Sequence, residues 1–324
     1  MGEALEIAKV LVSPTMKLLD MVDGAIGTAY EPRHKRKMAD ATAHEINVIA
    51  EAMRNAADMP VVYDKEGVAI NTDDFQRLMQ RASTRLLLQE TVKQHNIESI
   101  VDNAYEELEL DSEVSAVPVD PDWSIRFFNC IEDISNEKMQ YLWGKLLAGE
   151  VRDPGSFSLR TLEALKSLSQ AEAQIFRTVC EYIIVHKKSF NLPMHDRFYL
   201  NTPIDYADIM TLGEAGLLNF QDVAYRIHIV PGNSEVLTIG NIQLELKNTS
   251  DKLLRLRSLV YSLTIAGMEL FGIVNSGEYT KDQGSNMINP YVVMWVVEML
   301  KDSNIEKNRY SIIQNESQII VEIK

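Results

Sequence analysis

The strongest constraint on the fold of this chain is the spacing of its apolar residues between Asp122 and His186. Large apolar side chains recur there at steps of three and four residues, the spacing that places them on one face of an α-helix. One such face contains Trp123, Phe127, Phe128, Ile131 and Ile134. The pattern predicts a helical central domain, which we place at residues 70–186.

Cap and turn residues divide this domain into separate helices. Ser135 can cap the second helix, and Pro154-Gly155-Ser156 predicts a turn. Ser169 and Glu172 have the spacing of a capping box, so we expect them to start a helix that runs to Ile184.

Residues 1–60 predict an amphipathic helical arm. A first helix occupies the first 30 residues, with a kink at Pro14, and a second runs from about Glu31 to Ala57. The second helix carries a narrow stripe of mostly small residues: Ala39, Ala43, Ile46, Ala50, Met53 and Ala57. Such a stripe suits close contact between helices, so we expect a homo-oligomer formed through the N-terminal helices.

A loop at residues 59–72 separates the arm from the central domain. Thr72 can cap the following helix, whose apolar side chains we expect to face a core. These side chains are Phe75, Leu78, Met79, Ala82 and Leu86. A further helix is expected near residues 97–108, followed by an acidic linker that contains Pro118 and Pro121.

Residues 187–324 predict an α+β domain, so the fold class is mainly α with a C-terminal α+β domain. Short alternating runs predict strands at 226–230, 235–239, 243–246, 309–313 and 318–323. Pro231-Gly232-Asn233 predicts a hairpin turn, and short helices are expected at 206–215 and 265–274.

The order of helix, Gly216 and strands in this domain resembles a winged-helix arrangement. A DNA-reading helix would carry Lys or Arg, whereas this one offers Asp205, Asp208 and Glu214. Contact with a protein partner therefore fits better than DNA binding.

The net charge of −15 also makes nucleic acid an unexpected partner, because so acidic a chain repels a phosphate backbone. Two cysteines, Cys130 and Cys180, are too few for a disulfide framework and predict buried thiols. The sequence shows neither a signal peptide nor a membrane span, which predicts a cytoplasmic protein.

Several segments of the central domain carry a family resemblance. They are Asp122-Trp123, Glu132-Asp133-Ile134-Ser135, residues 140–150 and residues 154–162. Together they resemble a bacterial family described only as a domain of unknown function, number 2806. The helix start at Leu168-Ser169 is similar to that of the alpha-type abortive-infection proteins of phage defence. The resemblance implies a bacterial protein encoded among defence genes, and it implies no catalytic residues.

The turn before residue 159 is a candidate anion site. Its side chains surround a predicted helix N-terminus, where backbone N–H groups favour an anion. They are Ser156, Ser158, Arg160 and Thr161. The alternative is that the hydroxyl groups cap the helix and that Arg160 pairs with Glu150 or Glu132.

A second candidate is the basic run Arg33-His34-Lys35-Arg36-Lys37, the densest positive patch of the chain. Arg33, Lys35, Arg36 and Lys37 beside an amphipathic helix could bind an anionic membrane or nucleic acid. The alternative is a solvated face matched to acidic residues of a partner subunit.

No catalytic motif, metal-ligand spacing or phosphate loop is present in the sequence, so we expect no cofactor and no metal. Our first hypothesis is a non-enzymatic, oligomerising interaction protein of a bacterial stress or phage-defence response. The second is a peripheral membrane or anion-binding effector that works through residues 1–37. The third is a nuclease or nucleotide-processing enzyme with a site assembled from distant residues.

Overall fold

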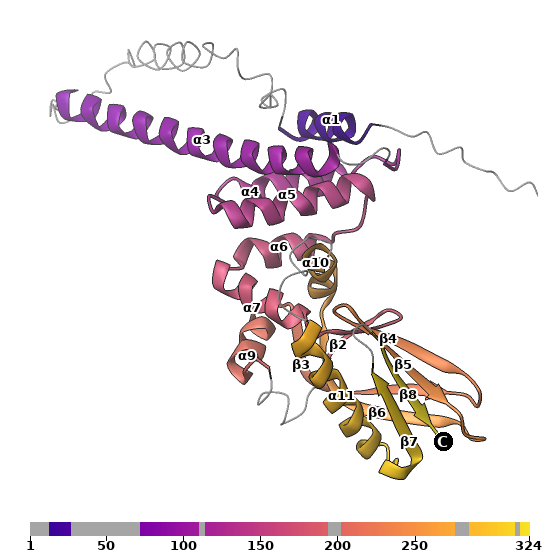
Figure 1. The fold of residues 1–324 in the computed structure, drawn as a ribbon. Coiled ribbons are helices and arrows are strands. Elements are labelled where there is room, and N and C mark those ends of the chain that lie inside the picture. Colours follow the sequence, from indigo (N-terminus) through magenta and orange to yellow (C-terminus); the bar gives the residue numbers. More distant parts are fainter. Residues whose placement is uncertain (1–12, 27–71, 110–113, 194–201, 276–284, 315–317) are drawn as a thin grey trace, which may run out of the picture. The chain divides into compact units, whose positions relative to one another are not determined.

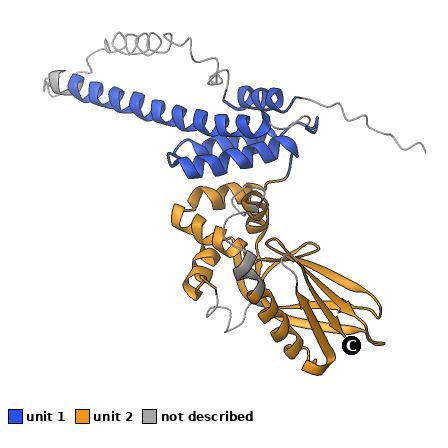
Figure 2. Cartoon of the chain, viewed as in Figure 1, with its two compact units in different colours: residues 1–155 blue, residues 156–324 orange. Residues whose placement is uncertain are grey.

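The computed structural model describes residues 13–26, 72–109, 114–193, 202–275, 285–314 and 318–324 (Figure 1). The chain divides into two compact units, residues 1–155 and 156–324 (Figure 2). Most of its elements are helices, and a mixed sheet lies in the C-terminal region, as the sequence predicts. Most of the predicted arm at residues 1–60 lies outside the described residues.

The first unit contains α1 (Pro14–Ile26), α3 (Thr72–Glu109), α4 (Pro121–Ile131) and α5 (Glu137–Arg152). The cap of α5 is Asn136 rather than the predicted Ser135, because the Asn136 side chain accepts from the N–H groups of Lys138 and Met139. The core of this unit is aromatic. Phe127 stacks on Trp123 with 5.1 Å between ring centroids and meets the edge of Trp143 at 5.5 Å.

Helix α3 is continuous over 38 residues, where the sequence predicted two helices. No glycine or proline interrupts it. The described residues cover its C-terminal half, where Ile100 and Ala104 are fully buried.

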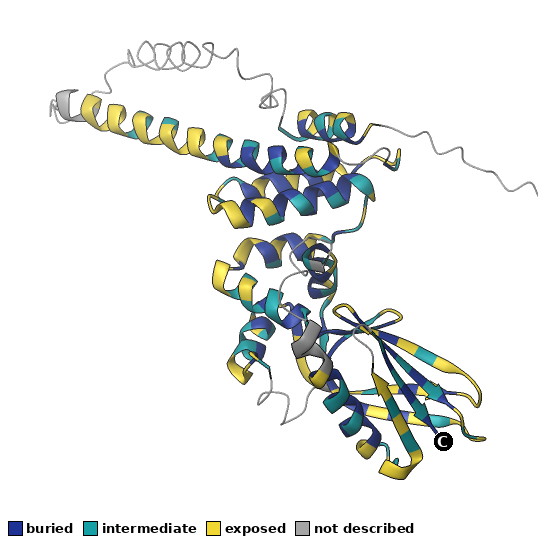
Figure 3. Cartoon of the chain, in the orientation of Figure 1, coloured by how far each residue is buried: buried dark blue, intermediate teal, exposed yellow. Residues whose placement is uncertain are grey.

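The prediction that Leu78, Met79 and Leu86 face a core is wrong, since they are 53%, 49% and 49% exposed. They lie on the same face of α3 as Ile100 and Ala104, at helical spacing. Their half of the helix continues past the ends of α4 and α5 and is exposed along its length (Figure 3).

The buried half of α3 comes very close to α5 at Gly144. A Cβ atom added to Gly144 would lie 2.6 Å from Cβ of Asn103 and 3.1 Å from the carbonyl oxygen of Ile100. Only a glycine permits this separation between the two helices.

The helices of the second unit are α6 (Leu159–Ser167), α7 (Gln170–Cys180), α9 (Tyr206–Glu214), α10 (Ile265–Asn275) and α11 (Ser285–Asp302). The capping box of Ser169 and Glu172 at the start of α7 is confirmed. The helix ends at Cys180 rather than at Ile184, because Ile184 belongs to a strand. Beyond α9, Gly216 has a φ of +72°, the left-handed conformation that ends many helices.

The strands are β1 (Ile184–His186), β2 (Ser189–Pro193), β3 (Leu218–Ile229), β4 (Ser234–Ile239), β5 (Ile242–Asn248), β6 (Leu254–Leu263), β7 (Tyr310–Gln314) and β8 (Gln318–Ile323). They form one sheet in the order β3-β6-β2-β1-β4-β5-β8-β7. All neighbours are antiparallel except β5 and β8. Helix α11 packs on this sheet, where Trp295 donates a hydrogen bond of 3.0 Å to the Ser258 hydroxyl.

The prediction of a hairpin at residues 231–233 is wrong, because the strands on either side of the turn do not pair with each other. The chain does turn there, with Gly232 at a φ of +77°. However, β3 pairs with β6, while β4 pairs with β1 and β5. Asn248 stabilises the turn, since its side chain donates to the Ile229 carbonyl at 2.7 Å. The change of sequence texture near residue 187 marks the first strands and lies inside the second unit.

We predict that Gly144→Ala lowers the free energy of unfolding by about 1–3 kcal/mol, because the new methyl group overlaps α3. Urea unfolding followed by circular dichroism measures the change. Gly24→Ala is the matched control, since nothing lies within 4 Å of a Cβ atom there. Equal stability of Gly144→Ala and the wild type would contradict the close contact.

Candidate functional site

The candidate anion site at the N-terminus of α6 is filled by a side chain of the protein itself. The carboxylate of Glu269, on α10, accepts hydrogen bonds from the Ser158 N–H at 2.8 Å and from the hydroxyl groups of Ser158 and Thr161. Thr161 is fully buried and Arg160 is exposed. The helix N-terminus therefore stabilises an internal anion. Binding of a separate anion by Ser156, Ser158, Arg160 and Thr161 stays a prediction.

The acidic residues considered as partners of Arg160 have other contacts. Glu150 accepts from the Gly155 N–H at 2.6 Å, and Glu132 forms an ion pair of 2.9 Å with Lys93. The basic run Arg33, Lys35, Arg36 and Lys37 lies outside the described residues, so its role also stays a prediction.

The second unit contains a cluster of ionisable side chains that sequence reasoning missed. The Nδ1 atom of His186 is hydrogen-bonded to the hydroxyl of Tyr225, and its Nε2 atom lies 2.9 Å from the carboxylate of Glu235. Glu235 also binds Lys187 at 2.9 Å. No sequence motif links these residues, because β1, β3 and β4 bring them together from distant positions.

The electrostatics of this cluster favour a structural role. Burial, reinforced by the charge of Glu235, raises the pKa of Tyr225 to about 12. Tyr225 therefore keeps its proton at neutral pH and is not an activated nucleophile. Hydrogen bonds from His186 and Lys187 lower the pKa of Glu235. The cluster ties β3 to β1 and β4, neither of which is its neighbour in the sheet.

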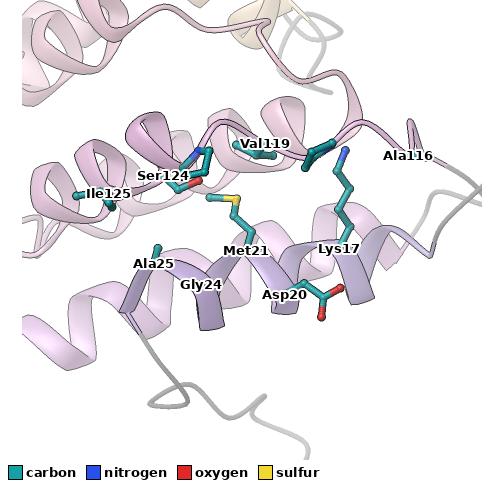
Figure 4. Close-up of a pocket in the computed structure, with 11 residues that line it drawn as sticks. Lys17, Asp20, Met21, Gly24, Ala25, Ala116, Val119, Ser124 and Ile125 are labelled. Atoms are coloured by element: carbon teal, nitrogen blue, oxygen red, sulfur yellow. The ribbon is translucent and has the colours of Figure 1, made fainter.

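The first unit contains a cavity of about 390 Å³ between α1 and the segment that leads into α4 (Figure 4). Most of its lining is apolar: Met21, Ala25, Val119, Pro121 and Ile125. This volume and lining are in the range of small-molecule sites.

Lys17 is the buried basic group of this cavity, with 8% of its surface exposed. Its ammonium group donates to the carbonyl oxygens of Ser115 at 2.8 Å and Val151 at 2.7 Å. Burial lowers the pKa of Lys17, an effect that Glu150 and Asp153 oppose. Lys17 therefore joins α1 to the linker and to the end of α5.

Other polar residues that drew attention in the sequence have structural uses. Asp205 and Asp208 form a reciprocal capping box at the start of α9. Cys130 and Cys180 are buried free thiols, as expected, and burial raises the pKa of Cys180 well above its usual value. Among the described residues, no group of three or more His, Cys, Asp or Glu side chains is placed to hold a metal ion. Within the same part of the chain, no helix has the length and apolar character needed to cross a bilayer.

We predict that Glu269→Gln lowers the free energy of unfolding by about 1–2 kcal/mol, because the hydrogen bonds at the α6 N-terminus lose their charge assistance. Thermal unfolding measures the change. Glu214→Gln is the control, since Glu214 is an exposed carboxylate of the same unit. If both variants unfold at the same temperature as the wild type, the Glu269 carboxylate contributes no stability at the helix N-terminus.

We predict that Glu235→Gln is less stable than the wild type by about 1 kcal/mol at pH 7. The wild-type carboxylate has a folded-state pKa below the unfolded value of 4.5, so its contribution is present above that pH and is lost as the pH falls through the folded pKa. The difference between variant and wild type should therefore shrink below pH 4.5. Urea unfolding at pH 7 and pH 3.5 tests this, and an equal difference at both pH values would refute it.

Comparison with known proteins identifies the family to which the chain belongs. Residues 80–283 match the family model described as protein of unknown function (DUF2806). No curated protein and no solved structure matches the chain. The matched range covers most of α3, the helices and strands from α4 through β6, and α10. The chain therefore belongs to the DUF2806 family.

Proposed function

We propose that this protein is a non-enzymatic interaction protein that self-associates through α3. The observation that supports it is the uncovered apolar stripe on the N-terminal half of this helix. Leu78, Met79 and Leu86 continue the face that Ile100 and Ala104 bury farther along. An apolar stripe of this kind gains stability when a second helix removes it from water.

The stripe covers about two turns of the helix. From Leu78 to Leu86 the helix advances about 12 Å at the usual rise per residue. Arg77, Arg81 and Arg85 flank it at steps of four, and all three are exposed. Their stems can cover part of the apolar surface while their charges stay in water.

The packing of the first unit favours an antiparallel arrangement of two copies. Helix α5 covers the same face of α3 from about Asn96 onward. A parallel second helix would bring its own covering helices into the space that α5 fills. In an antiparallel arrangement, the exposed N-terminal halves of the two α3 helices pack against each other. Both apolar stripes are then buried, and neither helix clashes with α5.

The polar groups of the described residues also support an interaction role. The cluster around His186 is bonded internally, and its Tyr225 stays protonated at neutral pH. The bacterial stress or phage-defence setting rests on the resemblance to abortive-infection proteins. The winged-helix-like arrangement near α9 remains part of this proposal as a surface for a protein partner.

The membrane alternative for residues 1–37 receives less support. Leu18 and Val22 of α1 are buried against the rest of the first unit, with 0% and 1% exposure. These side chains are therefore not available to a bilayer while α1 stays docked. Flotation with anionic vesicles remains the direct test, and binding that is lost when Arg33, Lys35, Arg36 and Lys37 become Ser would favour this alternative.

We predict that the full chain forms a dimer and that Leu86→Glu makes it monomeric, because the new carboxylate lies in the centre of the stripe. Sedimentation velocity over a range of concentrations measures the mass. Leu88→Glu is the matched control. Leu88 is 61% exposed on the same helix, but it lies two residues away and so on a different face.

Two outcomes would contradict the proposal. One is a wild-type chain that stays monomeric at all concentrations. The other is an equal loss of association in both glutamate variants, which would show that charge rather than the stripe is responsible.

A further inference from the structure

The outer face of strands β3 and β6 carries a square of four basic side chains. Arg226 lies opposite Arg257, and His228 lies opposite Arg255. All four are exposed, while the alternate residues Ile227 and Leu256 are buried on the inner face. We call these four residues the basic square.

The register places the members of each pair as close together as an antiparallel ladder allows. The Arg257 N–H donates to the Ser303 hydroxyl at 2.9 Å, so it points away from β3. Arg226 and Arg257 are therefore a non-hydrogen-bonded pair, in which Cα atoms are about 4.5 Å apart. The same holds for His228 and Arg255, which are two residues along each strand. The Arg226–Arg257 pair places like charges directly opposite one another, which destabilises a sheet.

No acidic side chain among the described residues neutralises this repulsion. None of the four side chains forms an ion pair with a described residue. The second unit is close to neutral, with 16 basic and 19 acidic residues, whereas the first has 16 and 28. The square is therefore a local positive surface on a unit that does not repel an anion strongly.

Protection of sheet edges does not by itself explain the square. Strand β3 is at the end of the sheet, and charged side chains on edge strands prevent unwanted pairing. Arg226 and His228 can serve this purpose. Arg255 and Arg257 lie where β6 has no described partner strand on its other edge, because β2 pairs with β6 at residues 260–262 and the Arg257 N–H bonds to Ser303. A cation on either strand prevents pairing, so edge protection does not require two arginines directly opposite one another.

The free edge of β3 adds a second feature to the same place. In the non-hydrogen-bonded register, the N–H and C=O groups of Ala224, Arg226 and His228 point away from β6. Among the described strands, none pairs with this edge. Backbone donors and acceptors therefore lie beside the basic side chains of the square.

We propose that β3 binds an extended acidic peptide segment as an additional strand. Its backbone would bond to Ala224, Arg226 and His228, and its carboxylates at alternate positions would lie over the basic square. Alternate residues of a strand repeat about every 7 Å, which is also the spacing of Arg226 and His228 along β3. Arginine suits this role because its planar guanidinium binds a carboxylate through two hydrogen bonds.

An acidic peptide strand fits this site better than a second copy of β3 or a nucleic acid does. A second copy of β3 would place Arg226 and His228 beside the same cations, which repel. Nucleic acid would use the arginines but not the backbone groups of the edge. Tyr225 on β3 points inward to His186, so it offers no stacking surface for a base.

The test uses the full chain and a fluorescein-labelled ten-residue peptide in which Glu alternates with Thr. Two control peptides replace Glu by Gln, or carry methyl groups on the four central backbone nitrogens, which removes backbone donors and keeps every side chain. Fluorescence anisotropy should show binding of the acidic peptide, at least tenfold weaker binding of both controls, and weakening by added salt. Hydrogen exchange should show that the peptide protects the amides of Ala224, Arg226 and His228.

The variant Arg226→Gln with Arg257→Gln should bind the acidic peptide at least tenfold more weakly. Its melting temperature should rise by about 1–3 °C, because the opposed charges are gone. This rise also shows that the variant folds. Lys188→Gln is the control, since Lys188 is an exposed cation of the same unit, and it should bind as the wild type does.

Three results would overturn the proposal. One is no binding of the acidic peptide. Another is equal binding of the backbone-methylated peptide, which would exclude strand addition. The third is a twenty-nucleotide single-stranded or duplex DNA that binds through Arg226 and Arg257 where the peptide does not, which would assign the square to nucleic acid.

Discussion

The packing of α3 against α5 is the interaction on which the first unit depends. Gly144 lets the two helices approach closely, and the aromatic core around Phe127 and Trp143 fills the space beside them. Helix α5 has 16 residues and α3 has 38, so α5 is too short to cover the whole length of α3. This difference in length creates both the stable body of the unit and the exposed apolar stripe that we assign to self-association.

The second unit depends more on buried polar contacts than the sequence suggests. Glu269 joins α10 to the start of α6, and the side chain of Asn248 holds the end of β3. The hydrogen bond between His186 and Tyr225 connects β1 to β3, which are not neighbours in the sheet. Each contact satisfies a group whose burial without a partner would cost free energy. Glu269, His186 and Glu235 thus help to hold the elements of this unit together.

Local signals in the sequence predicted local structure well. The capping box at Ser169 and the strand at residues 318–323 are confirmed, because caps and alternation act over a few residues. The alternation of Arg255 and Arg257 with buried neighbours was a usable signal for β6 that we missed. The cluster around His186 and the internal carboxylate at α6 depend on contacts between residues 39 or more positions apart, which one sequence does not reveal. The pairing of β3 with β6 rather than with the next strand, β4, is also a contact at a distance in the sequence.

The two hydrogen bonds from Lys17 to carbonyl oxygens have a consequence for where the folded part of this chain begins. The family match starts at residue 80, whereas Lys17, Leu18 and Val22 lie far upstream and complete the first unit. A shortened chain cut at the start of the match would leave the Val151 carbonyl without this donor and would uncover the apolar surface beneath α1. The folded first unit of this chain therefore includes α1, although the family match begins after it.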